Sequence, residues 1–145
     1  MPNLVDQLKQ NYPQFRFIPS GCARWSANEQ TIYYNNDDIQ TLHELGHALL
    51  GHNNYGQDIE LIQIERAAWE KAQQLAPRYG LSIDNDTIED ALDSYRDWLH
   101  QRSICPNCQQ TGIQSVRDLT YRCPNCQCTW RATDGRQTVV RRVRQ

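Results

Sequence analysis

The sequence lacks an apolar run of roughly 18 residues, the length at which a membrane-spanning helix becomes a candidate. Its first residues, 1–11, also lack the basic and then apolar segments of a signal peptide. We therefore expect a cytoplasmic protein without membrane contact. Internal repeats and low-complexity segments are absent too, which excludes a repeat array.

The composition limits the size of the fold. The 145 residues are enough for one domain, or for a domain with a small module attached, and 39% hydrophobic residues support a modest core. The net charge of −2 conceals an asymmetry, because residues 1–100 carry 7 Lys+Arg and 15 Asp+Glu whereas residues 101–145 carry 8 Arg and 2 Asp. Either the two oppositely charged parts dock on each other, or the basic part meets an acidic partner such as nucleic acid.

Apolar periodicity and turn residues predict an α+β fold. A short helix is expected over residues 3–11, followed by strands and then by three longer helices. The strands are expected at 15–18, 22–26 and 31–34, and the helices at about 37–50, 58–79 and 86–102. Asn35 or Asn36 is the expected cap of the first long helix, and Asp86 with Glu89 resembles a capping box at the third. The segment Thr31–Tyr34 is either an ordinary edge strand or the edge of a substrate cleft.

A metal-binding pattern lies within the first long helix, where His43, Glu44 and His47 form an HExxH motif. Residues four apart share a helix face, so His43 and His47 can bind one metal ion through their imidazole nitrogens. Glu44 lies beside that face and suits a general base that takes a proton from a metal-bound water. Gly46 permits the close approach of another backbone. The alternative is a pair of solvent-facing histidines on an amphipathic helix.

A catalytic zinc site usually has three protein ligands and one open position. Glu65 is the favoured third ligand, because it neighbours the buried stripe of the second long helix. Glu60, Glu70 and His52 remain alternatives. The residue that stabilises the oxyanion is open among Tyr55, Tyr79, Tyr95 and His100.

Two Cys-Pro-Asn-Cys pairs occur in residues 103–145, which we call the cysteine module: Cys105 with Cys108, and Cys123 with Cys126. In a chain without a secretion signal, this spacing predicts a closed site of four thiolates with a structural zinc ion, a zinc ribbon. Cys22 and Cys128 are left over. Asp134-Gly135 predicts a hairpin turn, and five arginines fall within residues 131–145: Arg131, Arg136, Arg141, Arg142 and Arg144. Their charge favours nucleic-acid contact, but no row of aromatic residues accompanies them.

The stretch TLHELGHALLGH at residues 41–52, with the segment 64–72 after it, resembles the ImmA/IrrE family of metallopeptidases. The resemblance covers roughly residues 15–80. It implies a zincin-like fold, Glu65 as the third zinc ligand, and regulatory cleavage of an intracellular protein such as a DNA-binding transcriptional repressor.

Together these features predict a zincin-like metallopeptidase domain over residues 1–102 and a zinc ribbon with a basic hairpin over 103–145. The expected cofactors are one catalytic and one structural Zn²⁺. Three other readings stay open. They are a peptidase of the SprT type that acts on DNA-bound proteins, a nuclease that uses His43, His47 and His52, and a non-catalytic zinc-ribbon protein that binds nucleic acid or protein.

Overall fold

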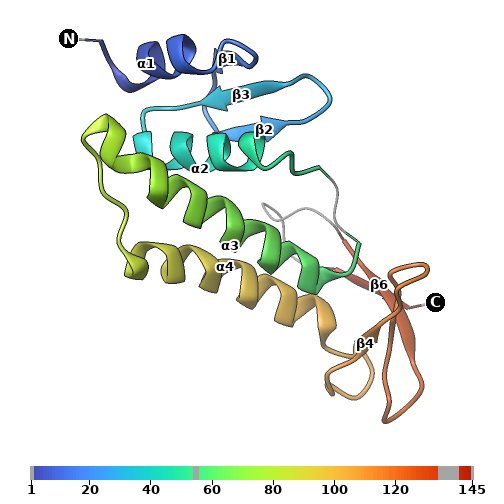
Figure 1. Ribbon diagram of the computed structural model, residues 1–145. Helices are drawn as coiled ribbons and strands as arrows, with labels where there is room; N and C mark the ends of the chain where they lie inside the picture. Colours follow the sequence, from blue (N-terminus) through green and yellow to red (C-terminus); the bar gives the residue numbers. More distant parts are fainter. Residues whose placement is uncertain (1, 54–55, 134–140, 145) are drawn as a thin grey trace. The chain divides into compact units, whose positions relative to one another are not determined.

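The computed structural model describes residues 2–53, 56–133 and 141–144 (Figure 1). Within these residues the fold is α+β, as the sequence predicted, and it has four α-helices and two small sheets. The chain packs as two compact units. The first unit consists of Met1–Asn54 and Gln63–Glu89, and the second of Tyr55–Ile62 and Asp90–Gln145.

The first unit begins with α1 (Leu4–Asn11), whose N-terminus is capped by the Asn3 side chain. The sheet that follows contains β1 (Arg16–Pro19), β2 (Arg24–Ser26) and β3 (Thr31–Tyr34). Its strand order is β1-β3-β2, with β1 parallel and β2 antiparallel to β3. The prediction of Thr31–Tyr34 as an edge strand is therefore wrong. The strand is central because β1 pairs with it along the side that β2 leaves free.

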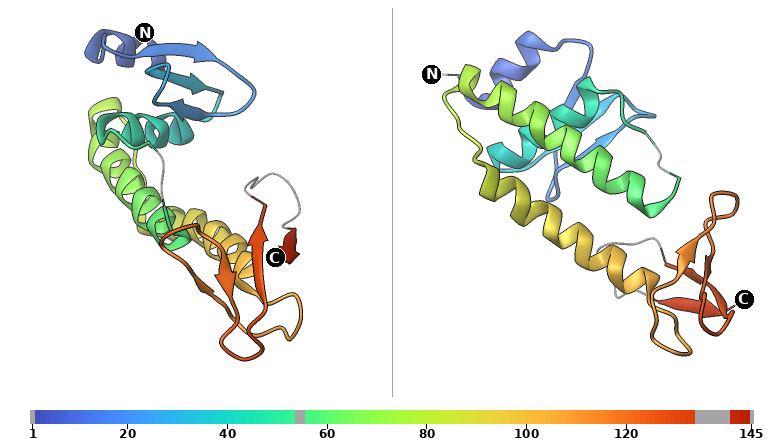
Figure 2. Two further views of the ribbon diagram at one scale, coloured as in Figure 1. Left: turned by 90° about the vertical axis from the view of Figure 1, so that its right-hand side faces the viewer. Right: turned by 60° about the horizontal axis from the view of Figure 1, so that its bottom comes forward.

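Helix α2 (Asp38–Leu49) lies between this sheet and α3 (Asp58–Leu75), as Figures 1 and 2 show. The cap of α2 is Asp37, whose carboxylate accepts hydrogen bonds from the N–H groups of Ile39 and Gln40. The expected cap was Asn35 or Asn36, and Asn35 instead accepts a bond from the Asp37 N–H. The cap thus lies one or two residues later than predicted, a local choice among neighbouring Asx side chains that all suit the position.

After α3, the segment Ala76–Tyr79 forms a 3-10 helix, and Gly80 ends it with a φ of 72°. Pro77 lacks the N–H that an α-helix would use there. Helix α4 (Asn85–Ser103) follows, and the carboxylate of Asp84 accepts from the Thr87 N–H at 2.8 Å. The capping residue is thus Asp84 rather than the predicted Asp86.

The second unit contains the first turn of α3, most of α4 and the cysteine module. The module's strands are β4 (Ile113–Gln114), β5 (Tyr121–Arg122), β6 (Thr129–Ala132) and β7 (Arg142–Arg144). They form an antiparallel sheet in that order, and β6 and β7 pair as the predicted hairpin requires. The turn predicted at Asp134-Gly135 lies outside the described residues. Within the described ranges, none of the helices combines the length and apolar content that crossing a bilayer requires.

Candidate metal centres

Helix α2 presents both histidines of the HExxH motif to the interior of the first unit. His43 and His47 are 3% and 8% exposed, and their ring centroids lie 4.6 Å apart. The reading of two solvent-facing histidines therefore does not fit the structure. Burial of two imidazoles costs free energy unless their nitrogens find partners, so a ligand or a charged group is expected beside them.

A close crossing of α2 and α3 brings the third group. A Cβ atom added to Gly46 would lie 2.4 Å from the Ala68 carbonyl oxygen, so the two helix backbones are in direct contact there. Glu65 is one turn before Ala68 on the same face of α3. It is buried, with 6% of its surface exposed, and its carboxylate points at the two histidines.

The three side chains converge on one point. Glu65 Oε2 lies 2.8 Å from His43 Nε2, and Glu65 Oε1 lies 3.3 Å from His47 Nε2. One ligand atom from each residue falls within a span of 4.8 Å, so the three could hold a metal ion. Two imidazoles and a carboxylate are a common donor set for a catalytic metal.

His43 provides an independent test of that fit. Both of its ring nitrogens are buried, and neither makes a hydrogen bond with a described residue, although Nε2 approaches the Glu65 carboxylate. The contact is short but not aligned for an N–H donor, whereas a metal ion between the two groups would satisfy both. The ring is also stacked on Trp69, with 4.2 Å between centroids and 8° between planes. Trp69 therefore fixes the orientation in which His43 faces the site.

The pKa values of the two carboxyl groups at the site, Glu65 and Glu44, shift in opposite directions. Burial alone raises the pKa of Glu65, but the contacts from His43 and His47 outweigh burial and hold that pKa well below its usual range. Burial raises the pKa of Glu44, and the neighbouring histidines and the Trp25 backbone N–H oppose the rise only in part. Glu65 thus suits an anionic metal ligand, and Glu44 suits a proton acceptor.

Glu44 lies beside the histidines but outside the converging group. Its Oε1 atom is 3.5 Å from His43 Nδ1, and the Trp25 backbone N–H is close enough to lower the pKa of its carboxyl. Trp25 belongs to β2, which is an edge strand of the sheet. The exposed edge beside the site is therefore β2 rather than the Thr31–Tyr34 segment that the sequence had indicated.

The remaining candidates do not join the three residues. Glu60 and Glu70 are exposed, and Glu60 accepts a hydrogen bond from the Gly56 N–H. Tyr79 interacts with Asn11, whose side-chain amide donates to the tyrosine hydroxyl. Tyr55 lies outside the described residues. For Tyr95 and His100, which belong to the second unit, no contact between described residues indicates a role as oxyanion partner.

His52 contacts the site from behind His47, a role that spacing on a helix could not reveal. The Nδ1 atoms of the two rings are 2.9 Å apart. The backbone of His52 is held at both ends, because its N–H donates to the His47 carbonyl and its carbonyl accepts from the Trp25 indole. If His47 held a metal ion through Nε2, its proton would reside on Nδ1 and be donated to His52, which would orient the ligand ring.

We expect the change His52→Ala to weaken metal binding at this site about 10–100-fold, because His47 would lose the acceptor that orients it. Competition with a chromophoric chelator measures the affinity. His52→Asn restores an acceptor and should recover part of the loss, and His100→Ala is the control for removing a histidine elsewhere. Equal affinities in the wild type and His52→Ala would contradict this role.

The second candidate centre is formed by the four predicted cysteines of the module. Cys105 Sγ lies 3.6 Å from Cys126 Sγ, and Cys108 Sγ lies 3.4 Å from Cys123 Sγ. Their sulfur atoms fall within 4.8 Å of one another, and Cys105 and Cys123 are fully buried. Four thiolates at this separation could bind a metal ion in a closed site. Cys128 packs against the cluster without joining it, and Cys22 is exposed.

The asparagine of each Cys-Pro-Asn-Cys pair also interacts with a sulfur atom of the other pair. The Asn125 side chain donates to Cys108 Sγ at 3.5 Å, and this bond lowers the pKa of the Cys108 thiol. Asn107 acts likewise on Cys126, whose pKa falls to about 6. Donors to the sulfur atoms stabilise the thiolate form that binds metal. The two asparagines are visible in the sequence, but their crossed pairing depends on the fold.

A buried polar network ties the module to the helices of the second unit. Asp58 of α3 accepts hydrogen bonds from Arg102 Nε at 3.0 Å and from the Tyr121 hydroxyl, and its N–H donates to Gln114 Oε1 at 2.7 Å. The Arg102 guanidinium lies over the Trp98 ring, 4.6 Å from its centroid. This buried ion pair is compensated by additional hydrogen bonds, which is the condition under which such pairs persist. The sequence-based boundary at residue 102 passes through this network.

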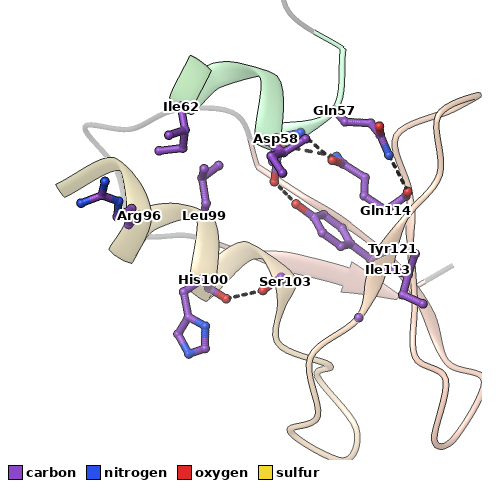
Figure 3. A pocket seen from close by; sticks show the side chains of 12 residues that line it. Gln57, Asp58, Ile62, Arg96, Leu99, His100, Ser103, Ile113, Gln114 and Tyr121 are labelled. Atoms are coloured by element: carbon purple, nitrogen blue, oxygen red, sulfur yellow. Dashed lines mark hydrogen bonds between the residues drawn. The ribbon is translucent and has the colours of Figure 1, made fainter. Parts of the chain in front are cut away.

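Beside the network is a cavity of about 440 Å³, shown in Figure 3. Ile59, Ile62 and Leu99 supply apolar walls, and Asp58 and Tyr121 point toward each other across one side. The buried carboxylate of Asp58 accepts hydrogen bonds from Arg102 and Tyr121, so this charge is already compensated.

Against known proteins, no family model, no curated protein and no solved structure matches this chain, so the chemistry of both centres rests on their own geometry.

Proposed function

We propose that this chain is a zinc-dependent endopeptidase with its catalytic centre at His43, His47 and Glu65. The convergence of these three buried groups beside Glu44 is the observation that carries the proposal. The donor set leaves room for a fourth position, which a catalytic zinc requires for water or substrate. The α2 helix packed on a small sheet agrees with the zincin-like fold that the resemblance to the ImmA/IrrE family implies.

The residues have separable roles in such a reaction. Zinc at this centre would acidify a bound water and polarise the scissile carbonyl. Glu44 takes a proton from that water and then donates it to the leaving amine. Its raised pKa favours this exchange, because a proton acceptor works best when its pKa is near the working pH. Trp69 and His52 hold the two histidines in orientation, and the cysteine module with its own zinc is structural.

The expected substrate is an intracellular protein such as a transcriptional repressor, which follows from the family resemblance. The alternative of a three-histidine nuclease is disfavoured, because His52 faces the Nδ1 side of His47 instead of the converging atoms. A SprT-type peptidase would use the same HExxH residues and differ in its substrate, whereas a non-catalytic binding protein would show no dependence on Glu44.

Glu44→Gln should reduce peptide-bond hydrolysis about 10²–10⁴-fold while leaving both metal ions in place, because only the proton acceptor is removed. Hydrolysis is measured on a mixture of denatured proteins by mass-spectrometric detection of new N-termini. Elemental analysis provides the control. It should give two zinc ions per chain in the wild type and in Glu44→Gln, and one in the double variant His43→Ala, His47→Ala.

Undiminished hydrolysis in Glu44→Gln would refute the proposed mechanism. One zinc ion per chain in both the wild type and the double variant would show that His43 and His47 hold no zinc. That result would favour the binding-protein alternative.

A further inference from the structure

The sheet of the cysteine module sorts its side chains onto two faces of different character. Cross-strand partners point to the same side, and the register pairs Ile113 with Arg122, Arg122 with Thr129, and Arg131 with Val143. These five residues therefore share one face, which we call the outer face. The pairing of β6 with β7 continues for one more residue pair, where the Thr133 N–H donates to the Arg141 carbonyl. Arg141 therefore also lies on the outer face.

The opposite face is closed. Tyr121 and Trp130 are buried there and stacked, with 5.4 Å between ring centroids and 8° between planes. Arg142 also projects to this side and donates to the Ile104 carbonyl at 2.7 Å. The C-terminal arginines are thus divided between the two faces, and the basic surface is not simply the C-terminal segment that the sequence indicated.

The outer face is exposed and positively charged at its centre. Arg122 and Arg131 are exposed on the two inner strands, whereas Ile113 and Val143, 67% and 56% exposed, lie on the two outer strands. Among the described residues of the four strands, none on this face is acidic. Asp118 of the β4–β5 turn lines the same surface hollow as Ile113 and Arg122, and its carboxylate accepts from the hydroxyl and N–H of Thr120.

We propose that the outer face binds the phosphate backbone of double-stranded nucleic acid without reading its sequence. Arginine guanidinium groups match phosphate geometry through paired N–H donors. At Arg122 a phosphate would replace Gln127 Oε1, which accepts from Nε and Nη2 of that side chain. Four strands about 4.8 Å apart span roughly 14 Å. A duplex presents one charge per roughly 1.7 Å of its axis, so several phosphates would meet this face.

The arrangement of residues distinguishes this partner from two others. A protein-binding patch usually has an apolar centre and a polar rim, and the outer face has the reverse arrangement. Single-stranded nucleic acid is bound largely by stacking of bases on exposed aromatic rings. The aromatic rings of this sheet are buried on the opposite face, so a phosphate backbone is the partner that fits.

The test is fluorescence anisotropy of a labelled 20-base-pair DNA duplex with the full-length, metal-loaded protein. Three neutralised phosphates predict that log affinity falls against log salt with a slope of about −2.7. The triple variant Arg122→Gln, Arg131→Gln, Arg141→Gln should bind at least tenfold more weakly, with a slope near zero. Retention of the cysteine-site metal verifies that the module is folded.

The matched control removes the same number of positive charges from exposed positions of the first unit: Lys9→Gln, Arg16→Gln and Arg78→Gln. It should bind the duplex as the wild type does. Equal losses in the two triple variants would overturn the assignment to the outer face. Preferential binding of single strands, or of polyglutamate over the duplex, would overturn the choice of partner. Because no hydrolysis is measured, this result is independent of whether the chain is a peptidase.

Discussion

Replacing Cys123 with serine is expected to unfold the cysteine module. The module has a small core, in which Cys105, Cys123, Tyr121 and Trp130 are the buried members, and half of these are metal-ligand candidates. In so small a unit the binding of metal supplies most of the folding free energy, about 10 kcal/mol or more. The change should therefore abolish one bound metal ion and also expose the amide groups of β4, β5 and β6 to rapid hydrogen exchange.

Cys128→Ser is the matched control, since Cys128 lies in the same module and packs on the same cluster but does not belong to the metal-binding group. Its effect should remain within about 1 kcal/mol, as for a partly buried side chain of nearly equal volume. Hydrogen exchange followed by mass spectrometry, with metal analysis of the same samples, compares the two. If Cys123→Ser kept its metal and its protection, the four-cysteine centre would be wrong.

Gly46→Ala should destabilise the first unit by about 2–4 kcal/mol, even though alanine is the better helix former by about 1 kcal/mol. The added Cβ would lie 2.4 Å from the Ala68 carbonyl oxygen, a backbone atom that can move only if α3 moves. Separation of the helices would also draw Glu65 away from His43 and His47. We therefore expect weaker metal binding together with a lower melting temperature, reduced by roughly 10 °C or more.

Gly21→Ala provides the comparison, because nothing lies within 4 Å of a Cβ at Gly21 and its φ is not in the left-handed region. That change should be neutral or stabilising by up to about 1 kcal/mol, through a smaller entropy of the unfolded chain. Thermal unfolding followed by circular dichroism, with metal titration, measures both variants. A Gly46→Ala protein with unchanged melting and unchanged metal affinity would show that the crossing of α2 and α3 is looser than the structure has it.

Much of both centres could be predicted because their key spacings are local. The i, i+4 interval of a helix places His43 beside His47. The two-residue gap within each Cys-Pro-Asn-Cys pair directs both of its thiols to one point. Gly46 was also predicted correctly to permit a close backbone approach, since a glycine within a helical pattern needs such a reason. The proximity of Glu65 followed from the buried stripe of its helix.

What sequence reasoning missed depends on contacts between distant segments. The parallel pairing of β1 with β3 has no local signal, so the central position of β3 was not anticipated. His52 follows the end of α2, where helical periodicity no longer gives the direction of a side chain. The sorting of arginines onto two faces of a sheet requires the register of β6 and β7, which composition cannot supply.

The network around Asp58 has a consequence for dividing the chain into fragments. A cut between residues 102 and 103 would leave Asp58 without the Tyr121 hydroxyl and the Gln114 side chain. It would also deprive the Trp130 indole of its acceptor, the Arg102 carbonyl. Both products would keep buried polar groups without partners, a costly state for each. The cysteine module is therefore not an independent folding unit. A fragment that is expressed alone or fused to another protein must also include the end of α4 and the first turn of α3.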